Sequence, residues 1–166
     1  MDLIVFANGT ARFQDVLCRC ALGRAGVAVV KREGDGATPV GTWRLRAGFY
    51  RADRLPLPGT SLPLQPLSPG DGWCDDPDNA RYNERVTLPY PGRTETLWRD
   101  DCAYDVIVPL GYNDHPVVPG LGSAIFLHVA KPGWPPTEGC VALALADLLR
   151  FLKHAGPESR VIVHGS

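Results

Sequence analysis

Long apolar runs and a surplus of charge are both missing from this chain of 166 residues. No apolar stretch approaches the roughly 18 residues that a membrane-spanning helix needs, so the sequence predicts no transmembrane segment. The formal net charge of -1 gives no electrostatic reason to bind nucleic acid or an anionic membrane. These deficits point to a globular protein whose partners are not selected by bulk charge.

Cysteine pairs with the spacing of a metal site are also lacking. The chain has five cysteines, and none forms a CxxC pair. An odd number allows one reactive thiol with up to two disulfides, or five reduced thiols, and both remain open. Cys18 and Cys20 point to the same face of a predicted strand, so they are poorly placed to pair with each other. The other three are Cys74, Cys102 and Cys140.

The first residues lack the features of a secretory signal. Met1 to Ala7 has no basic region and too short an apolar stretch. We therefore expect that a leader was omitted from this chain, that export follows another route, or that the protein is intracellular.

Glycine and proline are plentiful, with 18 and 16 residues respectively. Together with 45% hydrophobic and 21% charged residues, this composition is typical of one globular, loop-rich β domain over residues 1–166. We predict a mainly β fold of mixed sheets, arranged as a sandwich or a partly closed barrel, with one helix in the C-terminal half. The predicted strands are 2–6, 13–20, 27–32, 43–50, 103–110, 124–130 and 160–164, and 51–91 is predicted to be irregular.

The helix is predicted over residues 144–154. Its first turn holds Asp147, its last turn holds Lys153 and His154, and Gly156 followed by proline ends it. Four leucines recur at helical spacing and predict its buried face: Leu145, Leu148, Leu149 and Leu152.

A histidine and a cysteine carry the strongest chemical signal. His128 ends the apolar run Ala124–Leu127, and Cys140 follows twelve positions later, after a loop rich in proline and glycine. A strand can fix an imidazole while the loop folds a thiol back beside it, which suits a nucleophile with a general base. Gly139 removes a Cβ where an acyl group must approach the backbone. Because Cys140 precedes a helix-like segment, we expect the helix dipole to favour its thiolate.

A metal site is the chemical rival to this interpretation. His115, His128, Glu138 and Cys140 offer nitrogen, oxygen and sulfur ligands. No pair of them has the i, i+4 spacing of a helical ligand pair, so a zinc site is disfavoured. We predict neither a metal nor a cofactor.

The segment Thr137-Glu138-Gly139-Cys140 resembles the catalytic signature of the YkuD-like L,D-transpeptidases, which cross-link bacterial peptidoglycan. That family carries a histidine on a strand, a loop, and then Ser/Thr-His-Gly-Cys. Further similarity lies in Gly34–Trp43 and around Trp73, Tyr82 and Leu110–Asn113. The resemblance implies a cysteine acyl-enzyme acting on stem peptides in the periplasm or cell envelope, with Cys140 as nucleophile and His128 as base.

This sequence departs from the family pattern beside the thiol. Glu138 replaces the histidine that usually precedes Gly-Cys, and Ala142 replaces the usual arginine. Val129 replaces a small residue after the first histidine, and the loop between histidine and cysteine is shorter. We interpret these changes as a rebuilt donor pocket around a retained nucleophile and base.

Several other residues are predicted to bind substrate. Thr137 and Glu138 flank the thiol, and Trp134 lies in the loop before it, where it could cover the sulfur. Aromatic residues in irregular segments more often contact sugar or peptide than those in regular elements. On this basis the predicted substrate-binding set also includes Trp73, Tyr82, Tyr112 and Asn113.

Three functions are compatible with these features. The first is a monomeric L,D-transpeptidase that joins a donor stem peptide to the meso-diaminopimelate of an acceptor stem, with 1–3 links from L-Ala favoured over 3–3 links. The second is a cysteine endopeptidase or carboxypeptidase that trims such peptides. The third is a wall-binding module that has lost the chemistry.

Overall fold

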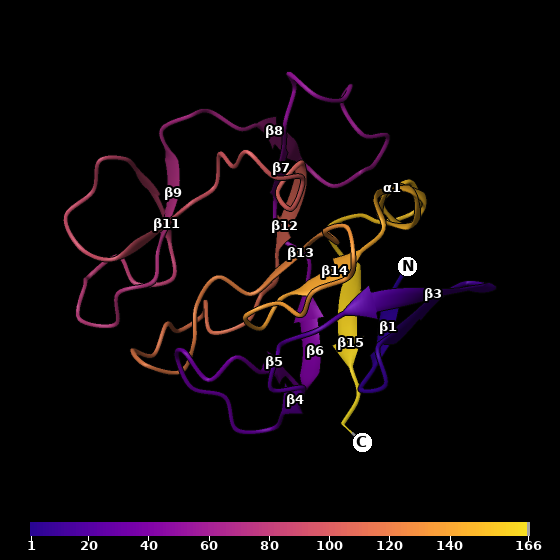
Figure 1. Cartoon of the computed structure of the whole chain (residues 1–166), viewed down its shortest axis with the longest axis horizontal. Helices are drawn as coiled ribbons and strands as arrows, with labels where there is room; N and C mark the ends of the chain where they lie inside the picture. Colours follow the sequence, from indigo (N-terminus) through magenta and orange to yellow (C-terminus); the bar gives the residue numbers. More distant parts are fainter. Residues whose placement is uncertain (166) are drawn as a thin grey trace.

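Residues 1–165 of the chain are described by the structure, a computed structural model. A ten-stranded sheet forms its centre, in the order β6-β15-β1-β2-β3-β14-β13-β12-β7-β8. A three-stranded sheet, β10-β9-β11, stands to one side (Figure 1), and β4 and β5 form a short parallel pair. The mainly β fold and the single helix predicted from the sequence are therefore confirmed.

The elements have the following bounds. The strands are β1 Leu3–Phe6, β2 Thr10–Phe13, β3 Val16–Ala21, β4 Val27–Ala28, β5 Thr38–Pro39, β6 Gly41–Arg44, β7 Gly48–Tyr50, β8 Leu64–Pro66, β9 Asp71–Cys74, β10 Arg85–Thr87, β11 Thr94–Thr96, β12 Val106–Pro109, β13 Phe126–Val129, β14 Val141–Leu143 and β15 Arg160–Val163, and the helix is α1 Leu145–Leu152.

The large sheet curls towards closure. Just after β6, Leu45 forms an antiparallel bridge with Leu110, which directly follows β12. The Arg46 amide donates to Pro109 at 2.9 Å, which joins the chain beyond the first strand of the sheet to a strand near its other end. Of the two predicted arrangements, the partly closed barrel is the one observed.

Two long predicted strands are in fact broken. The predicted strand 13–20 is the end of β2 followed by β3, with a turn at Gln14, whose φ is +47°. The predicted strand 43–50 is divided between β6 and β7, because the chain leaves one edge of the sheet and joins β12. The first break carries no glycine or proline signal in the sequence, whereas Gly48 stands at the second, as the first residue of β7.

Two other segments also differ from prediction. Only Val27–Ala28 of the predicted strand 27–32 is a strand; Val29 and Val30 are exposed and the Lys31 side chain is buried. The region 51–91, predicted to be irregular, contains β8, β9 and β10. These strands have three or four residues each, too few to show a periodic pattern in the sequence.

Helix α1 is shorter than predicted, and its buried face differs from the predicted one in part. It starts at Leu145, with Ala144 as its N-cap, and its buried residues are Leu148, Phe151 and Leu152. Leu145 is exposed although the leucine spacing predicted it to be buried. Phe151, which was not predicted to be buried, lies in the core instead. Asp147 lies in the first turn as predicted, but the basic residue of the last turn is Arg150. No helix among residues 1–165 is long and apolar enough to cross a membrane.

The strands β12, β13 and β14 lie between α1 and the small sheet (Figure 1). Leu127 and Val141 face the main core with Leu148 of α1. The alternate residues Phe126 and Cys140 belong to a second cluster on the other side. This second side, facing the small sheet, is where the functional residues gather.

Candidate active site

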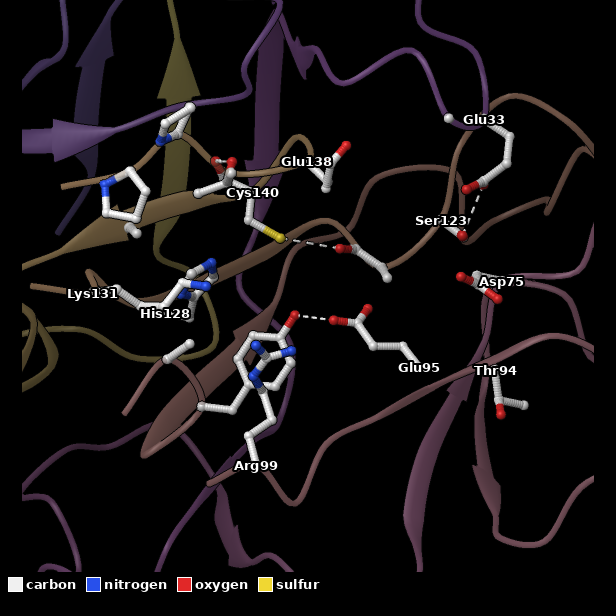
Figure 2. A pocket seen from close by; sticks show the side chains of 18 of the residues that line it. Glu33, Asp75, Thr94, Glu95, Arg99, Ser123, His128, Lys131, Glu138 and Cys140 are labelled. Carbon is white, nitrogen blue, oxygen red and sulfur yellow. Dashed lines mark hydrogen bonds between the residues drawn. The ribbon is translucent and has the colours of Figure 1, made fainter. Parts of the chain in front are cut away.

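A cavity of about 570 Å³ lies between the central strands and the small sheet. Cys140, directly before β14, and His128, in β13, both line it. Figure 2 shows the Cys140 sulfur and the His128 ring close to each other in this space. The other residues around the cavity are Lys31, Glu33, Gly34, Asp75, Arg93, Thr94, Glu95, Arg99, Ala103, Tyr104, Ser123, Ala124, Lys131, Pro135, Pro136, Thr137, Glu138 and Ala142.

The Cys140 thiol is held by two backbone groups of the neighbouring segment. Sγ lies 3.2 Å from the Ala124 carbonyl oxygen, to which it donates, and accepts from the Phe126 amide at 3.3 Å. These bonds follow from the parallel pairing of β13 with β14, which places Leu127 opposite Val141. The sulfur is thereby fixed in one position, with 8% of the residue exposed.

The turn before the thiol requires a glycine. Gly139 has a φ of +138°, and a Cβ at this position would lie 2.8 Å from the Ala37 carbonyl oxygen. Thr137 stabilises the same turn: its hydroxyl donates to the Cys140 carbonyl at 2.7 Å and accepts from the Gly139 amide at 3.1 Å. Thr137 was predicted to bind substrate, but its hydroxyl makes both of these hydrogen bonds within the turn.

His128 is buried and neutral. Its Nδ1 lies 2.9 Å from the Val129 carbonyl oxygen, which identifies Nδ1 as the protonated nitrogen and leaves Nε2 free to accept a proton. Burial lowers the pKa of His128 to about 4, so the ring is uncharged at neutral pH. A backbone carbonyl therefore orients the imidazole, and no carboxylate is needed.

The resting thiol is protonated. Burial, followed by the negative charge of Glu95, raises the pKa of Cys140 to about 12. The prediction of a thiolate favoured by a helix dipole is wrong, because Cys140 precedes strand β14 and α1 begins only at Leu145. A protonated thiol and a neutral imidazole therefore line the same cavity.

The opposite side of the cavity carries a carboxylate and a phenol that the sequence did not indicate. The Tyr104 hydroxyl donates to Glu95 Oε1, and the Tyr104 ring meets the His128 ring edge-on with centroids 5.2 Å apart. Arg99 lies over the Tyr104 ring at 5.2 Å. Glu95 comes from a strand of three residues in the small sheet, so no periodic pattern marked it.

The two ends of the cavity differ in charge. At one end, Arg99 and Lys131 share a single carboxylate, Asp101, at 2.6 and 3.7 Å. At the other end, Arg93 lies 3.2 Å from Asp75 and 3.9 Å from Glu33. Two cations and one carboxylate leave the first end with an excess of positive charge. One cation and two carboxylates leave the second end with an excess of negative charge. Figure 2 shows the thiol between these ends.

Glu138 lies at the opening of the cavity. Its side chain is 78% exposed, and Oε2 lies 3.0 Å from Nε of Arg24. Ala142, the other departure from the family pattern, is buried in the cavity lining opposite His128 in the strand pairing. An acidic and an apolar side chain thus occupy positions where the resemblance implied histidine and arginine.

All four aromatic residues predicted to bind substrate lie outside the cavity lining. The indole of Trp73 donates to Asn83 at 3.0 Å and packs against Phe126, between the two sheets. The ring of Trp134 lies under Arg19, with 4.8 Å from the guanidinium carbon to the ring centroid. The Tyr82 hydroxyl donates to Glu33, whose carboxylate does line the cavity.

Tyr112 and Asn113 hold the loop that follows them. The Tyr112 hydroxyl donates to the Leu121 carbonyl at 2.5 Å, and the Asn113 amide donates to the Gly122 carbonyl at 2.9 Å. This loop leads to Ser123, which lines the cavity and donates to Glu33 at 2.8 Å. Their contact with the cavity is therefore indirect.

Among residues 1–165, the cysteines form no disulfide and the candidate metal ligands form no cluster. All five cysteines are free thiols, which decides between the two redox arrangements that the sequence left open. Within residues 1–165, no three His, Cys, Asp or Glu side chains come together in a way that could hold a metal ion.

Comparison with known proteins bears on the family and the fold of the chain. The family model of the L,D-transpeptidase catalytic domain, YkuD, matches residues 2–163. The crystal structure of the helical cell shape determining protein Pgp2 from Campylobacter jejuni is similar, with a TM-score of 0.51 and 14% sequence identity. The match covers 99% of this chain and 47% of that chain, so this chain spans about half its length. At this identity the likeness shows the fold alone. None of the curated proteins compared matches the chain.

Proposed function

The chain belongs to the YkuD family of L,D-transpeptidase catalytic domains, and from this premise we propose that it transfers the acyl group of a peptidoglycan stem peptide through a thioester on Cys140. The observation that carries the proposal is the oriented thiol beside a neutral imidazole. Two backbone groups fix Sγ, and a backbone carbonyl leaves His128 Nε2 free as a proton acceptor. This is the arrangement that nucleophilic catalysis by cysteine needs.

Acylation proceeds in two steps. His128 Nε2 takes the thiol proton as Sγ attacks the peptide carbonyl carbon, and the resulting imidazolium returns that proton to the departing amine. The oxyanion needs a backbone donor beside the sulfur. Because the Gly139 amide donates to Thr137, the Cys140 amide is the donor we assign, with a contribution of about 3–4 kcal/mol. The product is a thioester that an amine of a second stem can attack.

The groups beside the thiol favour an uncharged acyl donor. Ala142 presents a methyl group and Glu138 a carboxylate paired with Arg24, so these two positions supply neither the arginine nor the histidine of the common family pattern. A donor with a carboxylate next to the reacting carbonyl would find no partner there. L-Ala of the donor stem has no such carboxylate, and we therefore propose 1–3 links to meso-diaminopimelate in preference to 3–3 links.

The setting of this reaction is proposed from its substrate. Peptidoglycan stem peptides lie in the cell envelope, and we propose that the protein acts there. Pgp2 is described as a cell shape determining protein, and a role for this chain in shaping the wall follows from the same chemistry.

The test is incubation of the protein with purified muropeptides. We expect a mass increase on Cys140 from the thioester and, with an acceptor stem present, a dimer whose linkage mass spectrometry identifies. Cys102→Ala, a thiol at the edge of the same region but outside the cavity lining, serves as the matched control. Shortened peptides without dimers would instead support the trimming hydrolase. Muropeptide binding without any thioester would support the wall-binding module.

A further inference from the structure

Glu95 is one of the titratable groups in the cavity that acylation leaves unused. It projects from β11 of the small sheet towards the space in front of the thiol, on the side away from His128's strand (Figure 2). Its charge acts on Cys140, whose pKa it helps to raise. Glu95 and Cys140 line the same cavity, so a nucleophile that enters it to attack the thioester passes between these groups.

One oxygen of this carboxylate is anchored and the other faces the cavity. Oε1 accepts from the Tyr104 hydroxyl, and Tyr104 is itself fixed against Phe126 and His128, with ring centroids 5.8 and 5.2 Å apart. Within residues 1–165, no hydrogen bond is made to Oε2 and no cation pairs with Glu95. The carboxylate is thus rigidly held with one acceptor oxygen available to a ligand.

Proton balance distinguishes the two nucleophiles that can attack a thioester. An acceptor ammonium has three protons, and the amide that it forms keeps one. The leaving thiolate takes one of the other two, so one proton must go to a further base. Water needs no additional base before its attack, because one of its protons restores the thiol and the other stays on the carboxylic acid until that product ionises in solvent. Transfer therefore requires one more proton acceptor than hydrolysis does.

We propose that Glu95 is this second base, which binds the acceptor ammonium and takes its first proton before the attack on the thioester. This inference rests on the proposed function. The neutral amine then forms the C–N bond, the C–S bond breaks, and the remaining surplus proton passes through His128 to the Cys140 thiolate. Glu95 afterwards releases its proton to solvent. Tyr104 acts as a positioning residue for the carboxylate.

The surroundings of Glu95 suit a base. Burial raises its pKa, against the opposing effects of the Tyr104 hydrogen bond and the Arg99 charge, while Asp75 and Glu33 raise it further. A carboxylate with a raised pKa accepts a proton more readily from an ammonium group. The same negative groups attract a cation to this side of the thiol.

The experiment compares Glu95→Gln with the unchanged protein. Both are loaded with donor muropeptide, and the fate of the Cys140 thioester is measured with water alone, with a diaminopimelate-containing muropeptide, and with hydroxylamine, an amine that is already neutral near pH 7. We expect the ratio of transfer to hydrolysis with the muropeptide to fall roughly ten- to a hundredfold. Transfer to hydroxylamine and hydrolysis should both stay within about twofold.

Two further variants sharpen this test. Glu84→Gln removes an exposed carboxylate, paired with Arg81, near the small sheet but outside the cavity lining, and should leave the ratio unchanged. Tyr104→Phe keeps the ring against His128 and removes the hydroxyl that anchors Glu95, so it should lower the ratio by a smaller factor.

An unchanged ratio in Glu95→Gln would overturn the inference, as would an equal loss with all three nucleophiles. In both cases a thioester on Cys140 in the unchanged protein would leave the proposed function standing. Failure of that protein to form a thioester would instead remove the proposed function itself.

Discussion

The central strands β13 and β14 present two faces made from alternating residues of the same short segments. Towards α1 the side chains are apolar and fully enclosed, as Leu127 and Leu143 show. Towards the small sheet, His128 and Cys140 are also nearly enclosed, but they line a cavity. Burial is thus common to both faces, and the difference lies in whether the neighbouring element fills the space or leaves it open.

Core packing and the cavity lining are separated by one residue along each of these strands. A β-strand directs successive side chains to opposite sides, so the packing of Leu127 against the core rigidly fixes His128 next to it. The apolar face therefore acts as the support on which the thiol and the imidazole are oriented. Substitutions on the cavity face should therefore reduce activity more than stability, and substitutions on the apolar face should reduce stability more than activity.

Removal of the nucleophile on the cavity face should have the largest effect on activity. Cys140→Ala should abolish thioester formation and product completely, because no other group in the position of Sγ can attack the carbonyl. The free energy of unfolding should change little, since the sulfur faces a cavity and leaves only backbone partners. Muropeptide turnover and chemical denaturation together check this. Product formation by the folded variant would remove Cys140 as the nucleophile.

Truncation on the other face of the same strand should do the reverse. Leu143→Ala removes a fully buried side chain from the main core and should lower the free energy of unfolding by about 2–5 kcal/mol. The fraction that remains folded should still form the thioester, which intact-protein mass spectrometry can measure at low temperature. A folded but inactive Leu143→Ala protein would show that the two faces are not separable.

Acid should reveal the burial of His128. Its pKa is about 4 in the folded chain and about 6.5 when exposed, so the unfolded chain binds the extra proton between these values. The associated stability is complete above pH 6.5 and is lost as the pH falls towards 4, by roughly 3 kcal/mol. Denaturation curves of the unchanged protein and of His128→Gln, which cannot titrate, should diverge over this interval. Parallel curves would contradict a buried neutral imidazole.

The smallest effect is expected at the opening of the cavity. Glu138→His restores the residue of the common family pattern and places a hydrogen-bond donor beside the thioester, which should shift the donor preference by about 1 kcal/mol towards stems with a nearby carboxylate. Product ratios from mixed donors measure the shift. Arg24→Gln is the matched control, because it breaks the same exposed ion pair and keeps the carboxylate. The same shift in both variants would assign the effect to the ion pair.

The sequence predicted the parts of this site that depend on local order along the chain. Gly139 directly before Cys140 and a strand ending near His128 are short-range features, and both are present. The helix was predicted from leucine spacing, and Leu148 and Leu152 are buried as predicted, but Leu145 is exposed and Phe151 completes the buried face. Strands of three or four residues left no periodic signal, so β9, β10 and β11 were not predicted.

The groups that face the thiol became apparent only in the folded chain. Glu95 and Tyr104 are distant from Cys140 in the sequence. Their approach to the thiol depends on how the small sheet packs against the central strands. The pKa values followed the same rule: burial raised that of Cys140 and lowered that of His128, against the dipole expected from local sequence. Cys140 and His128 could be recognised as a candidate nucleophile and base from the sequence, because both are residue identities in a local pattern. Their protonation states and the groups opposite them arise from desolvation and long-range packing, which no local pattern encodes.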